Sequence, residues 1–285
     1  MVNVMSGLVN LVSESLCFGG KVGFYSHLSS CCGCEMRFGV FVPPQAQEKR
    51  VPVLYFLSGL TSTEENFLMK SGVQKYAAEY GLMIVAPDTS PRNTGTPGED
   101  DDWNLGTGAG FYVDATAEPW NKHYQMYSYV VKELPGVIAE NFPAQTEKQG
   151  IFGHSMGGHG ALICALRNPN QYKSVSAFAP IASPIASEWG QKIFGSYLGV
   201  NQEAWREYDA SELVLSHRYP GTILIDQGTK DDYLAQLLPQ KFEEACKKAG
   251  QSLTLRMQKG YNHSYYFVAT FIEDHIRHHA GILGS

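Results

Sequence analysis

The sequence predicts an α/β fold with a mostly parallel central sheet and helices on both faces. Short apolar, β-rich runs alternate with stretches of helical patterning along most of the 285 residues. Several of these runs, such as 51–59 and 82–88, are continuously apolar, as expected for strands that are buried on both faces of a sheet. Strands that alternate with helical patterns of roughly 10–15 residues are typical of βαβ units.

Each expected strand is a short apolar run that ends at a turn or at a polar segment. The first, MRFGVFVPP, ends at Pro43 and Pro44, which cannot continue a sheet ladder. The expected strands are 36–44, 51–59, 82–88, 149–155, 174–180, 222–228 and 253–258.

The segments between these strands carry helical patterning. The expected helices are 63–81, 126–142, 157–169, 236–250 and 264–280. Pro135 and Pro239 lie inside two of them, so we expect those helices either to start later or to kink at the proline.

Composition and charge exclude several classes of function. The chain is 44% hydrophobic and 18% charged, which is ordinary for a globular protein. Because α/β folds of about 250 residues often form one domain, we expect a single domain over residues 1–285. The formal net charge of −6 provides no basic surface for nucleic acid and disfavours an anionic membrane surface.

The N-terminal segment 1–21 has a short apolar patch without a basic region before it, and Glu14 interrupts this patch. This pattern does not predict a signal peptide. No apolar run approaches the roughly 18–20 residues of a membrane-spanning helix. We therefore expect a cytoplasmic protein.

Three of the six cysteines, Cys31, Cys32 and Cys34, form a cluster. Such a cluster suggests a metal site, and strict alternation would place Cys32 and Cys34 on one face of the strand that follows. No second Cys or Cys/His pair lies nearby at the spacing of a zinc site, so we expect reduced structural thiols and no metal.

Polar residues follow four of the expected strands. In an open parallel sheet, the loops at the carboxyl ends of the strands build the functional site. We therefore expect the functional edge of the sheet to be built from segments 57–61, 154–156, 229–233 and 259–263.

Ser155 has the sequence context of a catalytic nucleophile. It is the serine of a Gly-x-Ser-x-Gly motif, Gly153–Gly157, with an expected strand before it and an expected helix after it. This is the setting of a nucleophile elbow, in which the serine occupies a strained turn. Glycines two positions before and after the serine remove Cβ atoms that would collide. The helix N-terminus next to Ser155 favours a developing negative charge.

A serine nucleophile needs a base and an acid, which α/β-hydrolases supply in the chain order Ser, acid, His. Of the nine histidines, His263 alone falls in the loop between the last strand and the last helix, so it is the predicted base. We expect the elbow to point His154 and His159 away from the Ser155 hydroxyl.

Three further histidines, His275, His278 and His279, lie near the end of the last helix, where they suit the helix dipole. Asp226, Asp231 and Asp232 are the candidates for the acid, and spacing alone does not separate Asp231 from Asp232.

Several long stretches resemble the S-formylglutathione hydrolase family, also called esterase D, over nearly the whole chain. They include LYFLSGLTSTEENF, GHSMGGHGAL, LIDQGTKDDYL and HSYYFVATFIEDHIRHHA. The resemblance implies an α/β-hydrolase fold with Ser155, Asp231 and His263 as the catalytic triad. The acid of the family lies in a Gly-x-x-Asp-x-aromatic-Leu motif, which favours Asp231 over Asp232.

The same resemblance implies that the backbone N–H groups of Leu60 and Met156 form the oxyanion hole. Many relatives have Thr-Cys-Thr where this chain has Thr61, Ser62 and Thr63. Ser62 removes the thiol near the active site, so we expect lower sensitivity to thiol reagents at this position.

The function implied by the resemblance is hydrolysis of the thioester S-formylglutathione through a formyl-enzyme on Ser155, without a metal or organic cofactor. The partner would be this small-molecule substrate, and the family suggests a homodimer. We expect a small acyl pocket, with Trp103 and Tyr112 either as its walls or as core aromatics.

Two other activities use the same triad, namely a general short-chain carboxylesterase and an acyl transferase of the mycolyl-transferase type. A non-catalytic binding protein on this fold is a further alternative. The complete set of Ser155, Asp231 and His263 counts against it.

Overall fold

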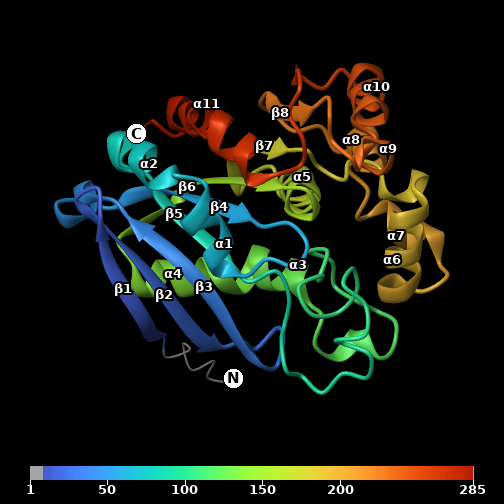
Figure 1. Cartoon of the computed structure of the whole chain (residues 1–285), viewed down its shortest axis with the longest axis horizontal. Coiled ribbons are helices and arrows are strands. Elements are labelled where there is room, and N and C mark those ends of the chain that lie inside the picture. Colours follow the sequence, from blue (N-terminus) through green and yellow to red (C-terminus); the bar gives the residue numbers. More distant parts are fainter. Residues whose placement is uncertain (1–8, 285) are drawn as a thin grey trace.

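A nine-stranded sheet runs through the centre of the molecule (Figure 1). The computed structural model describes residues 9–284. The strand order across the sheet is β1-β2-β3-β5-β4-β6-β7-β8-β9. The strands are β1 Asn10–Cys17, β2 Gly20–Leu28, β3 Glu35–Val42, β4 Val51–Leu57, β5 Met83–Pro87, β6 Ala144–His154, β7 Tyr172–Phe178, β8 Ile223–Gly228 and β9 Leu253–Gln258.

Neighbouring strands pair in parallel along the part of the sheet ordered β5-β4-β6-β7-β8-β9. The pairs β1–β2, β2–β3 and β3–β5 are antiparallel. The prediction of a mostly parallel sheet is therefore confirmed, and all seven expected strands are present. The sequence did not predict β1 and β2. The residues of β1 are almost all exposed, so they lack the apolar alternation that marks a half-buried strand.

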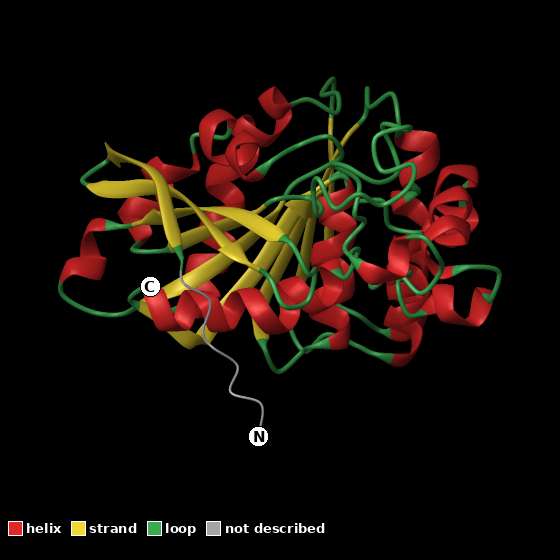
Figure 2. Cartoon of the chain, turned by 90° about the horizontal axis from the view of Figure 1, so that it is seen from below, coloured by secondary structure: helices red, strands yellow, loops and turns green. Residues whose placement is uncertain are grey.

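Helices cover both faces of this sheet (Figure 2), as expected for an α/β-hydrolase fold. Helix α5 packs against β4, β6 and β7, and helix α11 packs against β6, β7, β8 and α2. The helices are α1 Glu64–Lys70, α2 Val73–Tyr80, α3 Met126–Ser128, α4 Leu134–Asn141, α5 Met156–Arg167, α6 Glu188–Leu198, α7 Gln202–Arg206, α8 Ala210–Ser216, α9 Leu234–Leu237, α10 Pro239–Ala249 and α11 Tyr265–Leu283.

Glycine and proline modify three of the expected helices. The helix expected at 63–81 divides into α1 and α2 because Gly72 adopts a left-handed conformation with a φ of 69°. Residues Tyr129–Glu133 form a π-helical turn just before Pro135, whose missing N–H removes one helical hydrogen bond. Helix α10 begins at Pro239, so this helix starts late, as one of the two expected alternatives.

The cysteine cluster lies in a turn before β3 and not in the strand itself, so the expected alternation of Cys32 and Cys34 does not apply. All six cysteines are free. Burial, followed by the nearby Glu133 carboxylate, raises the pKa of the Cys31 thiol to about 12. Within residues 9–284, no group of three or more His, Cys, Asp or Glu side chains is placed to hold a metal ion.

The N-terminal segment for which no signal peptide is expected includes residues 1–8, which lie outside the described residues, while Asn10–Cys17 forms β1. None of the helices in the described part of the chain is long and apolar enough to span a membrane.

His275 and His279 on α11 face the sheet, so the expectation that they serve the helix dipole is wrong for these two residues. Both side chains are fully buried. His275 Nε2–H donates to Asp226 Oδ2 at 3.1 Å, and His279 Nε2–H donates to Ser176 Oγ at 2.9 Å. These bonds attach the last helix to β7 and β8.

Asp226 connects three elements at the end of β8. Its carboxylate accepts hydrogen bonds from Arg256 and Gln258 on β9 and from His275 on α11. Burial alone would raise the pKa of this carboxyl, but the hydrogen bonds from His275, Arg256 and Gln258 outweigh it and lower the pKa to about 2. Asp226 thus has a structural role, and it is not the partner of His263.

We predict that Asp226→Asn lowers the free energy of unfolding by roughly 3 kcal/mol, because it removes the buried carboxylate that pairs with Arg256 and accepts the His275 hydrogen bond. Chemical denaturation at pH 7 measures this loss, with Asp232→Asn as the exposed control, for which we expect a change within about 0.5 kcal/mol. Because the pKa of Asp226 is lowered to about 2, its stabilisation is complete above about pH 4 and disappears as the pH falls through about 2. Equal transitions for the two variants would contradict the prediction.

Candidate active site

Ser155 occupies the sharp turn between β6 and α5. Its backbone has a φ of 58° and a ψ of −120°, a conformation that a residue with a side chain rarely adopts. The turn is held by hydrogen bonds from Ser155 N–H to the Phe178 carbonyl and from His159 N–H to the Ser155 carbonyl, at 2.9 and 3.0 Å. The structure therefore has the backbone of the predicted nucleophile elbow.

The glycines around Ser155 allow three backbone segments to meet. A methyl group on Gly153 would collide with the carbonyl of Gly157, and one on Gly157 would collide with the carbonyl of Leu57 at the end of β4. A Cβ atom on Gly160 would lie 2.6 Å from the Tyr112 ring. These glycines are therefore required by close packing of β4, β6 and α5, beyond any need for a flexible turn.

The loop after β4 passes beside the nucleophile. A Cβ atom on Gly59 would lie 3.2 Å from the Ser155 Cβ, so this loop approaches Ser155 closely. Tyr112 Oη donates to the Ser58 carbonyl at 2.9 Å, and Thr61 N–H donates to the Gly108 carbonyl at 2.9 Å. Between these two anchors, the N–H of Leu60 donates to no backbone carbonyl within residues 9–284.

His263 and Asp231 are brought together by the loops after β9 and β8. His263 Nδ1–H donates to Asp231 Oδ2 at 2.7 Å, which leaves Nε2 of the ring as an acceptor. Lys230 N–H donates to the Tyr261 carbonyl at 2.9 Å and thereby attaches the two loops to each other. Asp232, by contrast, is exposed.

Asp231 is held as a carboxylate. Burial alone would raise its pKa, but hydrogen bonds from His263, from the Tyr233 N–H and from Gln227 lower the pKa below the usual range. An ionised carboxylate on Nδ1 fixes the histidine tautomer and stabilises a positive charge on the ring.

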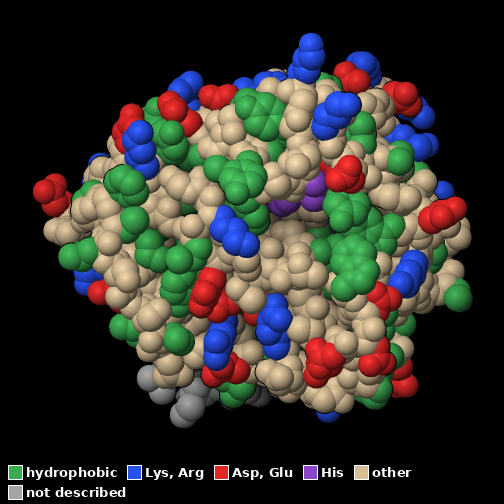
Figure 3. Space-filling view, viewed as in Figure 1, with side chains coloured by type: hydrophobic (Ala, Val, Ile, Leu, Met, Phe, Trp, Pro, Cys, Tyr) green, Lys and Arg blue, Asp and Glu red, His purple; other side chains and the backbone are tan. Residues whose placement is uncertain are grey.

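Ser155 and His263 line the same cavity, which has a volume of about 300 Å³. Figure 3 shows histidine side chains at the bottom of a hollow on this face of the molecule. In the described part of the chain no hydrogen bond joins the two side chains, and such catalytic contacts commonly tighten only when substrate is bound.

His154 lies in the cavity lining, next to His263. Its ring centroid is 4.5 Å from that of His263, and its Nε2 atom is buried without a hydrogen-bond partner among the described residues. Burial, and then the neighbouring His263, lowers the pKa of His154 well below its usual range, so this ring stays neutral. The other histidine next to the motif, His159, is buried and bonds to the Phe111 carbonyl.

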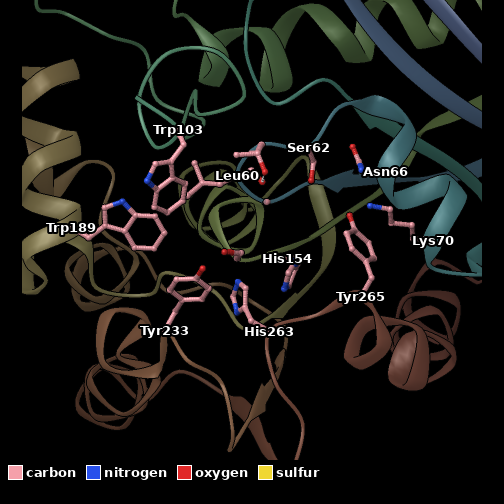
Figure 4. Close-up of a pocket in the computed structure, with 13 residues that line it drawn as sticks. Leu60, Ser62, Asn66, Lys70, Trp103, His154, Trp189, Tyr233, His263 and Tyr265 are labelled. Carbon is pink, nitrogen blue, oxygen red and sulfur yellow. Dashed lines mark hydrogen bonds between the residues drawn. The ribbon is translucent and has the colours of Figure 1, made fainter. Parts of the chain in front are cut away.

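One side of the cavity is aromatic (Figure 4). The ring centroids of Trp103 and Trp189 are 5.8 Å apart, and those of Trp189 and Tyr233 are 6.0 Å apart. The Tyr233 ring centroid lies 5.0 Å from that of His263. Trp103 therefore lines the cavity as one of the two expected alternatives. Tyr112 does not: it is fully buried beneath the Ser58 loop, which makes it a core aromatic.

The other side of the cavity is polar. Ser62 lines it, as expected, together with Asn66 and Lys70 from α1 and Tyr265 from the start of α11. Sequence reasoning missed Trp189, Lys70 and Tyr265. Trp189 lies on α6, which was not predicted, and nothing in the local sequence distinguishes Lys70 or Tyr265 from ordinary helical residues.

A serine on a strained strand-to-helix turn, next to a histidine–carboxylate pair on a mostly parallel sheet, is the arrangement of an α/β-hydrolase-fold enzyme. Comparison with known proteins narrows this class. The esterase family described as "Putative esterase" matches residues 29–278.

The chain belongs to the S-formylglutathione hydrolase family. It is 54% identical to the S-formylglutathione hydrolase of Rattus norvegicus over 96% of this chain and 98% of the relative. The enzyme of Arabidopsis thaliana is 55% identical over 98% of this chain and 99% of its own length. The solved structure of an S-formylglutathione hydrolase from Agrobacterium tumefaciens superposes with a TM-score of 0.94 at 50% identity, and covers 96% of this chain and 100% of that one.

We predict that Gly157→Ala disrupts the elbow, because the added methyl group overlaps the Leu57 carbonyl and a buried backbone clash has no room to relax. We expect a loss of about 3 kcal/mol or more in the free energy of unfolding, measured by thermal or chemical denaturation. Gly136→Ala is the matched control. A Cβ atom there meets nothing within 4 Å, and removing a helical glycine should stabilise the protein by about 0.5–1 kcal/mol. An unchanged transition for Gly157→Ala would refute the packing argument.

Proposed function

We propose that this protein hydrolyses S-formylglutathione to formate and glutathione. The observation that carries the proposal is a serine on a strained turn that faces the same cavity as the His263–Asp231 pair. It occurs in a chain that is more than half identical to S-formylglutathione hydrolases over nearly its whole length.

In the proposed first step, Ser155 Oγ attacks the formyl carbon while His263 Nε2 takes the hydroxyl proton. The C–S bond then breaks, and the glutathione thiolate leaves with the proton from His263. Asp231 fixes the histidine tautomer and stabilises the imidazolium that forms. In the second step, water attacks the formyl-enzyme with His263 as the base. The ester bond to Ser155 Oγ then breaks, His263 returns the proton to Ser155 Oγ, and formate leaves.

The negative oxygen that develops in each step would be bound by the backbone N–H groups of Leu60 and Met156. The close approach of Gly59 to Ser155 supports this assignment, as does the Leu60 N–H, which donates to no backbone carbonyl within residues 9–284. Met156 is the first residue of α5, where N–H groups have no helical partner. Each such donor contributes roughly 3 kcal/mol of transition-state stabilisation.

A second candidate function is a general short-chain carboxylesterase. The aromatic side of the cavity favours it, because Trp103, Trp189 and Tyr233 offer apolar surface on which an acyl group larger than formyl can pack. Both functions use the same triad, and they differ only in which acyl and leaving groups fit.

Three further features are proposals as well. We infer that residues 1–285 form one domain, because the sheet spans residues 10–258 and α11 packs back onto its centre. The six free thiols are usual in a reducing compartment and support a cytoplasmic location. The proposal that the protein forms a homodimer rests on the family resemblance alone.

The experiment that tests the function compares kcat/KM for S-formylglutathione with that for 4-nitrophenyl acetate. We expect the thioester to be preferred by several orders of magnitude. Ser155→Ala should lower both rates by about 10⁴-fold or more, because it removes the nucleophile. If the acetate is hydrolysed equally well or better, the carboxylesterase function holds instead.

Asp231→Asn should lower kcat by about 10³- to 10⁴-fold on both substrates, because the amide no longer enforces the tautomer with a free Nε2. Asp232→Asn, one residue away and exposed, should leave kcat within about twofold. Steady-state kinetics on the two purified variants checks this pair. A strong effect of Asp232→Asn together with an active Asp231→Asn would reverse the assignment of the acid.

A further inference from the structure

The two ends of the active-site cavity differ in chemistry, with His263 and His154 between them (Figure 4). Trp103, Trp189 and Tyr233 form the aromatic end. Asn66, Lys70 and Tyr265 belong to the opposite, polar end. A substrate that reacts at Ser155 therefore places its two halves in different surroundings.

Lys70 is the one Lys, Arg, Asp or Glu residue among the described residues that line this cavity. Its ammonium lies 5.6 Å from the centroid of the Tyr265 ring, a favourable cation–π distance. No carboxylate within residues 9–284 lies within 4.0 Å of it, so its charge is available to a ligand. This positive charge lines the cavity of a protein whose formal net charge is −6.

The position of Lys70 is determined by the packing of α1. Phe67 and Leu68 of this helix are buried, and a capping box between Thr63 and Asn66 fixes its first turn. Asn66 and Lys70 are four residues apart, so they lie on the same face of the helix. Asn66 Oδ1 accepts from Thr63, which leaves the amide N–H groups of Asn66 for the cavity.

We propose that Lys70, assisted by Asn66, forms a subsite for a carboxylate of the leaving thiol. An ammonium next to amide donors suits a carboxylate. Glutathione carries two carboxylates and one ammonium at neutral pH, so it is a net anion. The thiol half of the substrate then lies towards α1 and Tyr265, and the acyl group points towards the aromatic end. This inference rests on the proposed function and adds how the anionic leaving group is selected.

The test compares Lys70→Glu with the wild-type enzyme on two formyl thioesters, S-formylglutathione and the uncharged S-formyl-N-acetylcysteamine. Reversal of the charge should lower kcat/KM for S-formylglutathione by about tenfold, mainly through KM, because a like charge now faces the carboxylate. The rate on the uncharged thioester should change less than about twofold. Lys70→Arg should retain most of the preference for the anionic substrate.

Lys75→Glu is the matched control. Lys75 is also an exposed helical lysine over a tyrosine ring, 5.2 Å from the Tyr76 centroid, but it is not among the residues that line the cavity. The change in net charge is the same, so a long-range effect of charge would appear in both variants. We expect Lys75→Glu to hydrolyse both thioesters at the wild-type rate.

The results separate this inference from the proposed function. Suppose that the wild-type enzyme prefers S-formylglutathione to the aryl acetate. If Lys70→Glu then leaves kcat/KM for S-formylglutathione unchanged, or lowers kcat/KM equally for both thioesters, the proposed subsite is wrong and the proposed function stands. Equal losses in Lys70→Glu and Lys75→Glu also overturn the subsite. If the wild-type enzyme hydrolyses S-formylglutathione no better than the aryl acetate, the proposed function itself fails, and the subsite fails with it.

Discussion

The close contact of three backbone segments at Ser155 is the constraint on which the rest of the site depends. β4 ends at Leu57, β6 ends at His154, and α5 begins at Met156, and they meet so closely that Gly153 and Gly157 cannot carry side chains. In this space the chain can turn only through the unusual backbone angles of Ser155. Such a conformation is costly and persists because the surrounding packing imposes it. The same contact presents the serine hydroxyl and the start of α5 to one cavity.

The second requirement is that two loops reach this serine from the other half of the sheet. The parallel pairing of β8 with β9 places the loops at 229–233 and 259–263 side by side. Within β8, Asp226 binds Arg256 of β9 and His275 of α11 and so connects these elements. In the loop after β8, Asp231 accepts a hydrogen bond from His263. Asp226 and Asp231 are only five residues apart, yet Asp226 stabilises the fold whereas Asp231 orients His263.

The cavity in turn joins elements that are distant in sequence. Its aromatic end comes from the 98–110 loop, α6 and the β8 loop, while its polar end comes from α1 and the start of α11. In the proposed mechanism, the chemistry depends on Ser155, His263 and Asp231, and the choice of substrate depends on the two ends of the cavity.

The sequence by itself determined the features that are encoded locally. These are the seven core strands, an interruption of the helical pattern at Pro239, and the strand-to-helix turn at Ser155. Only the tertiary structure showed that Tyr112 supports the Ser58 loop, that His275 and His279 face the sheet, and that Trp189 and Lys70 line the cavity. The edge strand β1 was missed because it buries neither face. The reason is physical: strand and turn signals depend on neighbours in the chain, whereas a side chain's surroundings depend on which distant segments pack against it.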